Sequence, residues 1–176
     1  RRADGSVQLG EAAIKVEEFI PDKIQVSVLG PPAGAAQGLL EFTARARQLF
    51  GAPAAALPVE AQVRFLSAVF SHPKFPDHRF ADPARSFSEQ VIELGEGRLD
   101  ANGDKTYMLP VPRTLLPPSM LLAQFYAEVR DTGGRPVGAT LSVPVHRYPY
   151  YLGIKTDRRG TVHVGESVRL EWVAIK

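Results

Sequence analysis

Oxygen-bearing side chains recur at alternate positions between residues 100 and 104. Asp100, Asn102 and Asp104 follow the spacing that begins a calcium-binding loop. Such a loop needs glycine at its sixth position and glutamate at its twelfth, but here Gly103 comes fourth and no glutamate follows in place. Asn102-Gly103 is also a strong signal for a type I′ turn between two strands. We therefore predict a hairpin turn at this point and no metal site.

The histidines do not form a ligand pattern either. The chain has four of them, His72, His78, His146 and His163. The first two share a segment rich in proline and aromatic residues, at an interval that matches no familiar metal site, and only Asp77 adds a carboxylate beside them. We expect a surface loop here, with Phe75 and Phe80 packed over the open end of the fold, and the other two histidines at strand edges.

Nucleophilic and acid–base catalysis have no recognisable framework in this sequence. It contains no Gly-x-Ser-x-Gly elbow and no glycine-rich phosphate loop before a helix. It contains no cysteine, which excludes thiolate chemistry, disulfides and thiolate metal sites. Glu17 and Glu18 are adjacent, and adjacent strand residues point to opposite faces, so the two cannot easily act as one acid–base pair. We predict no catalytic residue, no cofactor and no metal ligand.

Three tyrosines lie close together at residues 148, 150 and 151. An exposed, flat group of aromatic rings could stack on a sugar, which would suit a carbohydrate-binding module. The same rings could instead pack between two domains, because the segment separates one alternating run from the next. We favour interdomain packing. Exposed rings would support the binding module, and buried rings would count against it.

Bulk composition narrows the class of protein further. The chain has 176 residues, of which 44% are hydrophobic and 23% charged, as in an ordinary globular protein. A net charge of +2 without a lysine–arginine cluster does not predict nucleic-acid binding. No apolar run reaches the roughly 18 residues of a membrane-spanning helix, so we expect no membrane contact by this chain itself. Because it begins with Arg1 and closes on the strand-like run 170–176, we expect a piece of a longer protein.

Apolar and polar residues alternate along most of the chain, which is the pattern of strands with one buried face. The clearest runs cover residues 24–28, 41–47, 59–65 and 137–145, and residues 87–94 form a less regular one. Residues 105–110 are expected to be a short strand that ends at a proline. Residues 119–129 are ambiguous, because Ser119 could cap a helix through Val129. A strand is favoured there, since a single turn at 131–134 would then join it to the run 137–145. The sequence predicts an all-β fold.

Several phrases resemble the macroglobulin domains of the bacterial alpha-2-macroglobulin family. One is Gly51-x-Pro53 after an aromatic residue, followed by a strand that begins Val59-x-x-x-Val63. A second is Val16–Asp22, which resembles the junction between successive domains of that family. A third is the corner at residues 127–137, AEVRDTGGRPV. None of these phrases carries chemistry.

The resemblance implies a seven-stranded antiparallel β-sandwich of the fibronectin type III-like macroglobulin kind. Residues 1–20 would be the last strand of a preceding domain, residues 21–147 a complete sandwich, and residues 148–176 the opening strands of a following domain. The neighbouring macroglobulin domains of the same chain would then be its partners. The junctions at Phe19–Asp22 and His146–Tyr151 would fix the angles between domains.

The function that the resemblance implies is structural. The chain would be a non-catalytic domain of a protease-trapping inhibitor, whose full-length parent encloses an endopeptidase after a bait region is cut. The parent would be periplasmic and lipid-anchored to the inner membrane. A thioester in the parent would lie outside this chain, which has no cysteine. The alternative is a fibronectin-like adhesion or carbohydrate-binding module of a bacterial surface protein.

Overall fold

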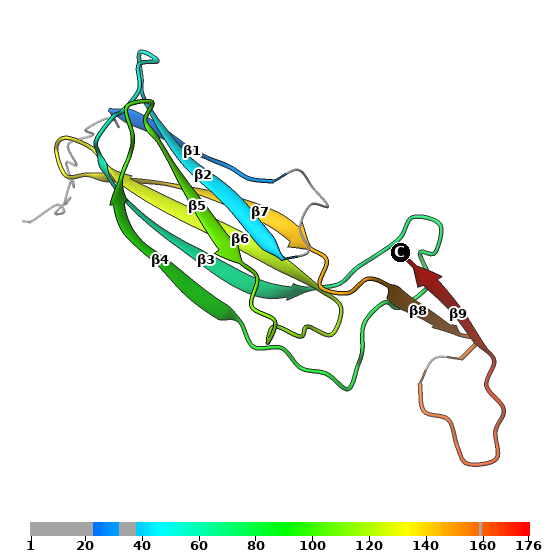
Figure 1. The fold of residues 1–176 in the computed structure, drawn as a ribbon. Coiled ribbons are helices and arrows are strands. Elements are labelled where there is room, and N and C mark those ends of the chain that lie inside the picture. Colours follow the sequence, from blue (N-terminus) through cyan, green and yellow to red (C-terminus); the bar gives the residue numbers. More distant parts are fainter. Residues whose placement is uncertain (1–22, 32–37, 159) are drawn as a thin grey trace, which may run out of the picture.

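The described residues form strands joined by turns and irregular connections (Figure 1). The computed structural model describes residues 23–31, 38–158 and 160–176. Within these ranges, no helix is long and apolar enough to cross a membrane. The strand expected in residues 1–20, the Glu17-Glu18 pair and the junction at Phe19–Asp22 lie outside the described residues.

Seven strands build two antiparallel sheets that face each other (Figure 1). The smaller sheet has the order β1 (Ile24–Leu29), β2 (Leu39–Gln48), β5 (Asp104–Pro110), and the larger has the order β4 (Gln90–Arg98), β3 (Pro58–Ala68), β6 (Met120–Arg130), β7 (Pro136–Val145). A separate pair, β8 (Tyr151–Thr156) and β9 (Leu170–Ile175), follows beyond the end of the sandwich. The predicted seven-stranded β-sandwich is confirmed.

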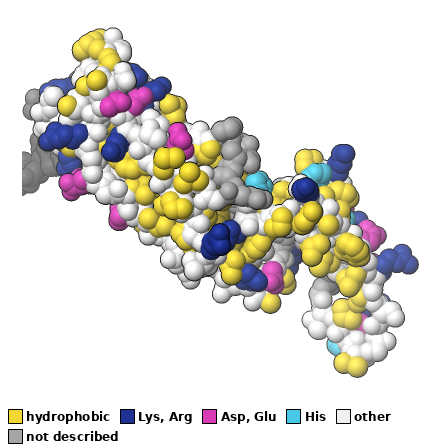
Figure 2. All heavy atoms as spheres, in the orientation of Figure 1, with side chains coloured by type: hydrophobic (Ala, Val, Ile, Leu, Met, Phe, Trp, Pro, Cys, Tyr) yellow, Lys and Arg dark blue, Asp and Glu magenta, His cyan; other side chains and the backbone are white. Residues whose placement is uncertain are grey.

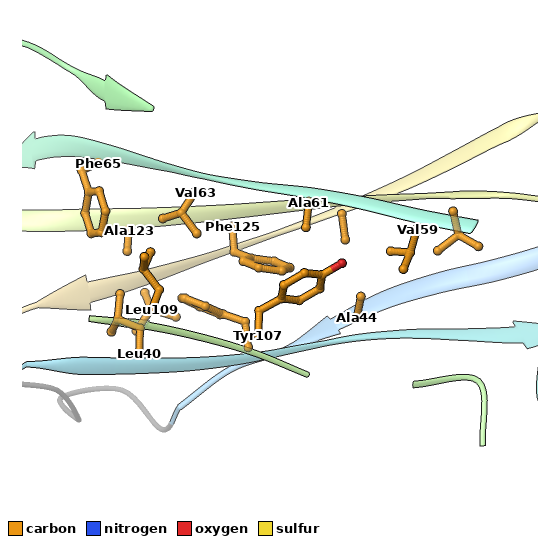
Figure 3. Packing of buried hydrophobic residues seen from close by; sticks show 14 of the residues in the cluster. Leu40, Ala44, Val59, Ala61, Val63, Phe65, Tyr107, Leu109, Ala123 and Phe125 are labelled. Atoms are coloured by element: carbon orange, nitrogen blue, oxygen red, sulfur yellow. The ribbon is translucent and has the colours of Figure 1, made fainter. Parts of the chain in front are cut away.

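The core lies between the two sheets and comes from alternate residues of their central strands (Figure 3). Phe42 of β2 stacks on Phe125 of β6, with ring centroids 4.7 Å apart, and both side chains are fully buried. Tyr107 of β5 packs against the same Phe125 ring. The period of two in the sequence therefore puts one face of each strand into this layer, as the alternation predicts.

The first strand of the sandwich closes against the last. β1 pairs with β2 on one side and also contacts β7 of the other sheet. Just after β1, Gly30 lies so close to β7 that a Cβ atom there would be 2.5 Å from Cδ2 of Leu141. The smaller and larger sheets thus meet along this side of the sandwich.

The ambiguous stretch 119–129 forms no helix: the strand β6 covers Met120–Arg130, and the predicted hairpin with β7 is confirmed. The turn between β6 and β7 is held by Asp131, whose Oδ1 accepts the backbone N–H of Gly133 at 2.7 Å and of Arg135 at 3.0 Å. Ser119 caps no helix. It is buried, and its Oγ accepts the backbone N–H of Phe70 at 2.9 Å.

The predicted hairpin at Asn102-Gly103 is wrong, although a turn is present. Type I′ geometry needs positive φ at both central residues, whereas Gly103 has φ 69° and Asn102 is not among the described residues with positive φ. The carboxylate of Asp100 accepts the backbone N–H groups of Asn102 and Asp104. The turn carries the chain from β4 in one sheet to β5 in the other, because β4 pairs with β3 and β5 with β2.

The strand expected from Phe87 begins later, at Gln90, and extends further, to Arg98. Its register against β3 shifts between Ala61, which faces Gly95, and Gln62, which faces Glu93. Gly95 has φ 80°, the backbone conformation that a glycine bulge requires. This bulge explains the imperfect alternation in the sequence of β4.

The two ends of the sandwich differ in their connections. The turn end carries the connections 49–57, 99–103 and 131–135. The junction end carries the connections 69–89 and 111–119, together with the segment 146–150 that leads into β8. The longest of these connections, 69–89, leaves the sandwich and runs alongside β8 (Figure 1).

Candidate functional site

The connections of the junction end meet the first residues of β8 around a cleft of about 1100 Å³. Proline and aromatic side chains contribute much of its lining, including Pro76, Pro118 and Tyr148, and β8 contributes Leu152 and Ile154. This cleft lies where the sandwich passes into the β8–β9 pair, at the position for which interdomain packing was predicted.

Tyr151 is the central side chain of the junction end. Its ring stacks on Phe70 with centroids 4.1 Å apart and an angle of 9° between the planes. Its hydroxyl lies 2.9 Å from Nδ1 of His146. Burial, with a smaller contribution from Tyr148, raises the pKa of Tyr151 to about 12. Tyr151 therefore stays protonated across the physiological range and acts as a packing residue with a hydrogen bond.

The segment around Phe80 packs directly on β8. Phe80 is buried and meets Phe70 edge-on, with centroids 5.2 Å apart. A Cβ atom at Gly153 would lie 2.5 Å from Cε1 of the Phe80 ring. Arg79 and Ile154 exchange two backbone hydrogen bonds of 2.8 and 3.0 Å. The expected packing of Phe80 at the open end is thus present, and its partner is the strand that follows the sandwich.

The three tyrosines do not form a flat exposed patch. Tyr151 is buried, and the Tyr148 hydroxyl donates to the carbonyl of Pro117 at 2.7 Å. Arg85 donates to the same hydroxyl at 3.4 Å. Tyr150 is the exposed one, at 55%. This arrangement favours packing over sugar binding, as the sequence predicts.

The two faces of the β8–β9 pair differ sharply. One face carries Tyr151 and Gly153 and packs against the sandwich. The opposite face carries exposed apolar side chains, namely Leu152, Ile154, Leu170 and Trp172, the last at 74% exposure. Figure 2 shows hydrophobic side chains gathered over this part of the molecule.

His72 and His78 approach the same ring rather than a shared ligand. Their rings lie 5.5 and 5.3 Å from the ring of Phe75, centroid to centroid. Within the described part of the chain, no group of three or more histidine, aspartate or glutamate side chains could hold a metal ion. The histidine segment is thus an aromatic cluster within the connection 69–89.

The carboxylates at residues 100–104 serve the turn end. Asp104 accepts two hydrogen bonds from Arg45, of 2.9 and 2.7 Å, and Arg47 lies 3.5 Å away. The hydrogen bond from Arg45 is the main cause that holds the pKa of Asp104 below its ordinary value. Asp100 bonds to backbone N–H groups, so these oxygens have protein donors as partners.

The arrangement at the junction end can position neighbouring structure but shows no catalytic geometry. The charged side chains at the cleft include Asp77 and Lys155, and these two pair with each other at 3.5 Å. The absence of catalytic, cofactor and metal residues stays a prediction. Sequence reasoning missed Phe70 and Gly153, because their role depends on which segments meet in space. The recurrence of aromatic residues at 70, 75 and 80 was the available signal.

Comparison with known proteins assigns the sandwich to a family. The family model described as "Bacterial Alpha-2-macroglobulin MG5 domain" matches residues 24–146. The alpha-2-macroglobulin of Xylella fastidiosa is 30% identical over 132 residues, which are 73% of this chain and 8% of that protein. The alpha-2-macroglobulin homologue of Yersinia pestis is 28% identical over 158 residues, which are 86% of this chain and 8% of that protein.

Solved structures agree on the fold. The native conformation of Escherichia coli alpha-2-macroglobulin matches with a TM-score of 0.65 at 18% identity, over 88% of this chain and 10% of that one. Salmonella alpha-2-macroglobulin reacted with methylamine matches with a TM-score of 0.62 at 20% identity, over 80% of this chain and 9% of that one. The chain thus spans about a tenth of such proteins. It belongs to the bacterial alpha-2-macroglobulin family, and residues 24–146 form a domain of its MG5 type.

Proposed function

We propose that this chain is a non-catalytic framework domain of a protease-trapping inhibitor of the alpha-2-macroglobulin family. Its task is mechanical, because it is a rigid sandwich that sets the position of the domains before and after it. A parent protein that encloses a protease must move its domains, and domain surfaces of modest size allow such movement. The trapped endopeptidase is a partner of the whole parent rather than of this domain.

The observation that carries the proposal is the match of residues 24–146 to a family model. The alpha-2-macroglobulins that this chain resembles are much longer, and the chain covers only 8% of their length. A short unit within a long chain of this family is expected to contribute structure to a larger assembly. The exposed apolar face of the β8–β9 pair, with Leu152 and Trp172, supports the view that residues 148–176 open a following domain. On that view, the rest of the following domain covers this face.

The adhesion or carbohydrate-binding alternative has less support from the geometry. A sugar-binding platform needs aromatic rings that are flat and exposed together. Here Tyr151 is buried against Phe70, and the hydroxyl of Tyr148 is bonded to Pro117. Of the three tyrosines, Tyr150 is exposed, Tyr148 is half-buried and Tyr151 is buried, so they offer no shared exposed platform.

The compartment belongs to the same proposal. We propose that the parent is periplasmic and held to the inner membrane by a lipid at its N-terminus, as the resemblance to the bacterial alpha-2-macroglobulins implies. Separating inner membrane, periplasm and cytoplasm of cells that produce the parent, followed by immunodetection of residues 24–146, tests this placement. Detection in the cytoplasm alone would contradict it.

The function is tested with the full-length parent and an added endopeptidase. We expect cleavage of the parent to change its mobility on a native gel. The bound protease should still cut small peptides but should fail to cut large protein substrates. The matched control is the same protease with its active site blocked, which cannot cut the parent and should leave its mobility on the native gel unchanged. Degradation of the parent without size-selective protection would overturn the trap and would move the assignment to the adhesion module.

A further inference from the structure

We propose that the connection 69–89 is a brace that couples the sandwich rigidly to the β8–β9 pair, so that the two turn together as one body. The inference deepens the proposed function and rests on it, because rigid coupling is what a framework domain would use. Three sets of contacts carry the proposal: a backbone pairing, an aromatic stack and a close approach at a glycine.

The backbone pairing attaches the connection 69–89 to the free edge of β8 through one isolated antiparallel bridge. Arg79 donates its N–H to the carbonyl of Ile154 at 2.8 Å, and Ile154 donates to the carbonyl of Arg79 at 3.0 Å. The other edge of β8 pairs with β9. An isolated two-stranded pair is marginally stable in water, so a third segment supplied by the sandwich helps to order it.

The aromatic stack crosses from one body to the other. Phe70 follows β3 closely, and its backbone N–H is fixed by the buried hydroxyl of Ser119. Its ring stacks on Tyr151, the first residue of β8, and meets the ring of Phe80 edge-on. Offset and edge-on ring contacts have preferred geometries. A rotation of β8 relative to the sandwich would therefore separate rings that are now in contact.

Gly153 brings the backbone of β8 onto Phe80. A Cβ atom at this position would lie 2.5 Å from Cε1 and 2.6 Å from Cζ of that ring. Real Cβ contacts do not come this close, so only glycine allows the observed distance between strand and ring. Both residues are buried, so a Cβ atom at this position could be accommodated only if the strand and the ring moved apart.

Charge contributes little to this coupling. The ion pair between Lys155 and Asp77 has a 3.5 Å separation, and its side chains are 39% and 71% exposed. Ion pairs on the surface are screened by salt and side-chain motion. The apolar and backbone contacts are therefore expected to hold the brace together, and added salt should leave its geometry unchanged.

Pulsed electron spin resonance on the 176-residue chain measures the coupling directly. The chain has no cysteine, so Ser142→Cys in β7 and Ala174→Cys in β9 accept spin labels at two sites only. Both positions are exposed. In the labelled chain without further substitutions, we expect one narrow distribution of the distance between the two spin labels, and the same distribution at high salt. Gly153→Val, which forces strand and ring apart, should turn this into a broad or displaced distribution.

Phe70→Ala tests the same coupling without added bulk, and it should also broaden the distribution. Tyr150→Ala is the matched control, because it removes an exposed tyrosine beside the brace and should change nothing. Circular dichroism on each variant identifies those whose sandwich remains folded. A broad distribution in the labelled chain without further substitutions would overturn the proposed brace. Narrow, unchanged distributions in folded Gly153→Val and Phe70→Ala would overturn it as well. No protease is involved, so the brace and the protease trap can fail independently.

Discussion

At the turn end of the sandwich, carboxylates hold the chain; at the junction end, aromatic rings do. Asp131 binds two backbone N–H groups of its turn, and Asp104 binds the guanidinium of Arg45. At the opposite end, Phe70, Phe80 and Tyr151 pack on one another across the boundary to β8. Both ends rest on the same core between them.

This difference separates two tasks. Hydrogen bonds that a carboxylate accepts from nearby backbone N–H groups fix a local turn, and their effect ends within that turn. Rings that come from the connection 69–89 and from β8 fix the relative position of segments that are distant in sequence. The turn end therefore keeps the sandwich in its own shape, whereas the junction end is built to hold something that follows the sandwich.

Removing the shared core should weaken both ends together. Phe125→Ala deletes a fully buried ring that contacts Phe42 and Tyr107, and such deletions cost about 3–5 kcal/mol of unfolding free energy. Urea denaturation measures this loss, and hydrogen exchange should show faster amide exchange at both ends. Exchange that rises at only one end would mean that the ends are separate cooperative units, and the comparison would fail.

Two glycines of the turn end should differ in how much stability is lost when each is replaced by alanine, because Gly103 is crowded and Gly134 is not. Gly103 has φ 69°, and a Cβ there would lie 2.5 Å from the carbonyl oxygen of Ala46. Gly134 has φ 80° but no neighbouring atom within 4 Å of such a Cβ. Gly134→Ala should therefore cost about 1–2 kcal/mol for the left-handed backbone alone, and Gly103→Ala distinctly more. Equal losses in urea denaturation would contradict the crowding at Gly103.

The two ends should respond to opposite extremes of pH. In the folded chain the pKa of Asp104 lies below the ordinary 3.8, and that of Asp131 is also lowered, chiefly by the backbone N–H of Arg135. Lowered carboxyl pKa values stabilise the fold above the unfolded pKa, and this stabilisation is lost as pH falls toward the folded values. The pKa of Tyr151 is raised to about 12 from an ordinary 10. The stabilisation that this shift reflects is fully present below pH 10 and is lost as pH rises from 10 toward 12.

Two variants test whether the acid loss of stability belongs to the turn end and the alkaline loss to the junction end. Asp104→Asn should reduce the loss of stability in acid, at a cost near neutral pH of about 1 kcal/mol for an interaction partly screened by water. Tyr151→Phe should reduce the loss in alkali and leave the acid limb unchanged. Tyr107 also has a raised pKa from burial, so part of the alkaline loss remains. Thermal unfolding across pH measures both limbs, and an acid limb altered by Tyr151→Phe would break the assignment.

Much of the sandwich could be predicted from the sequence because its strands have one buried face. The alternation of Val59, Ala61 and Val63 is visible without knowing their partners, and all three are buried. The hairpin at residues 131–134 could also be predicted, since turn and strands are adjacent in the chain. Its Asp131 supplies the side-chain acceptor that such corners use.

The predictions from sequence were wrong where a local turn or strand pattern did not determine which distant strand it would pair with. Asn102-Gly103 is a turn in both the prediction and the structure, but the sheet that each flanking strand joins is decided by β2 and β3. Phe87 was expected within a strand, yet it precedes β4 and packs half-buried against the core. The contact between Phe70 and Tyr151 could not be predicted, because the alternation of apolar and polar residues does not show which loop residue will pack on which distant strand.

The meeting of β1 with β7 has a consequence for the order in which the domain is made. β1 can pair with β2 while the chain is still short, since the two strands are close in sequence. Its contact with the other sheet needs β7, which ends at Val145. Contacts between segments so far apart slow folding. During synthesis, one side of the sandwich therefore stays open until almost the whole domain has left the ribosome, and the apolar faces of β3 and β6 need protection until then.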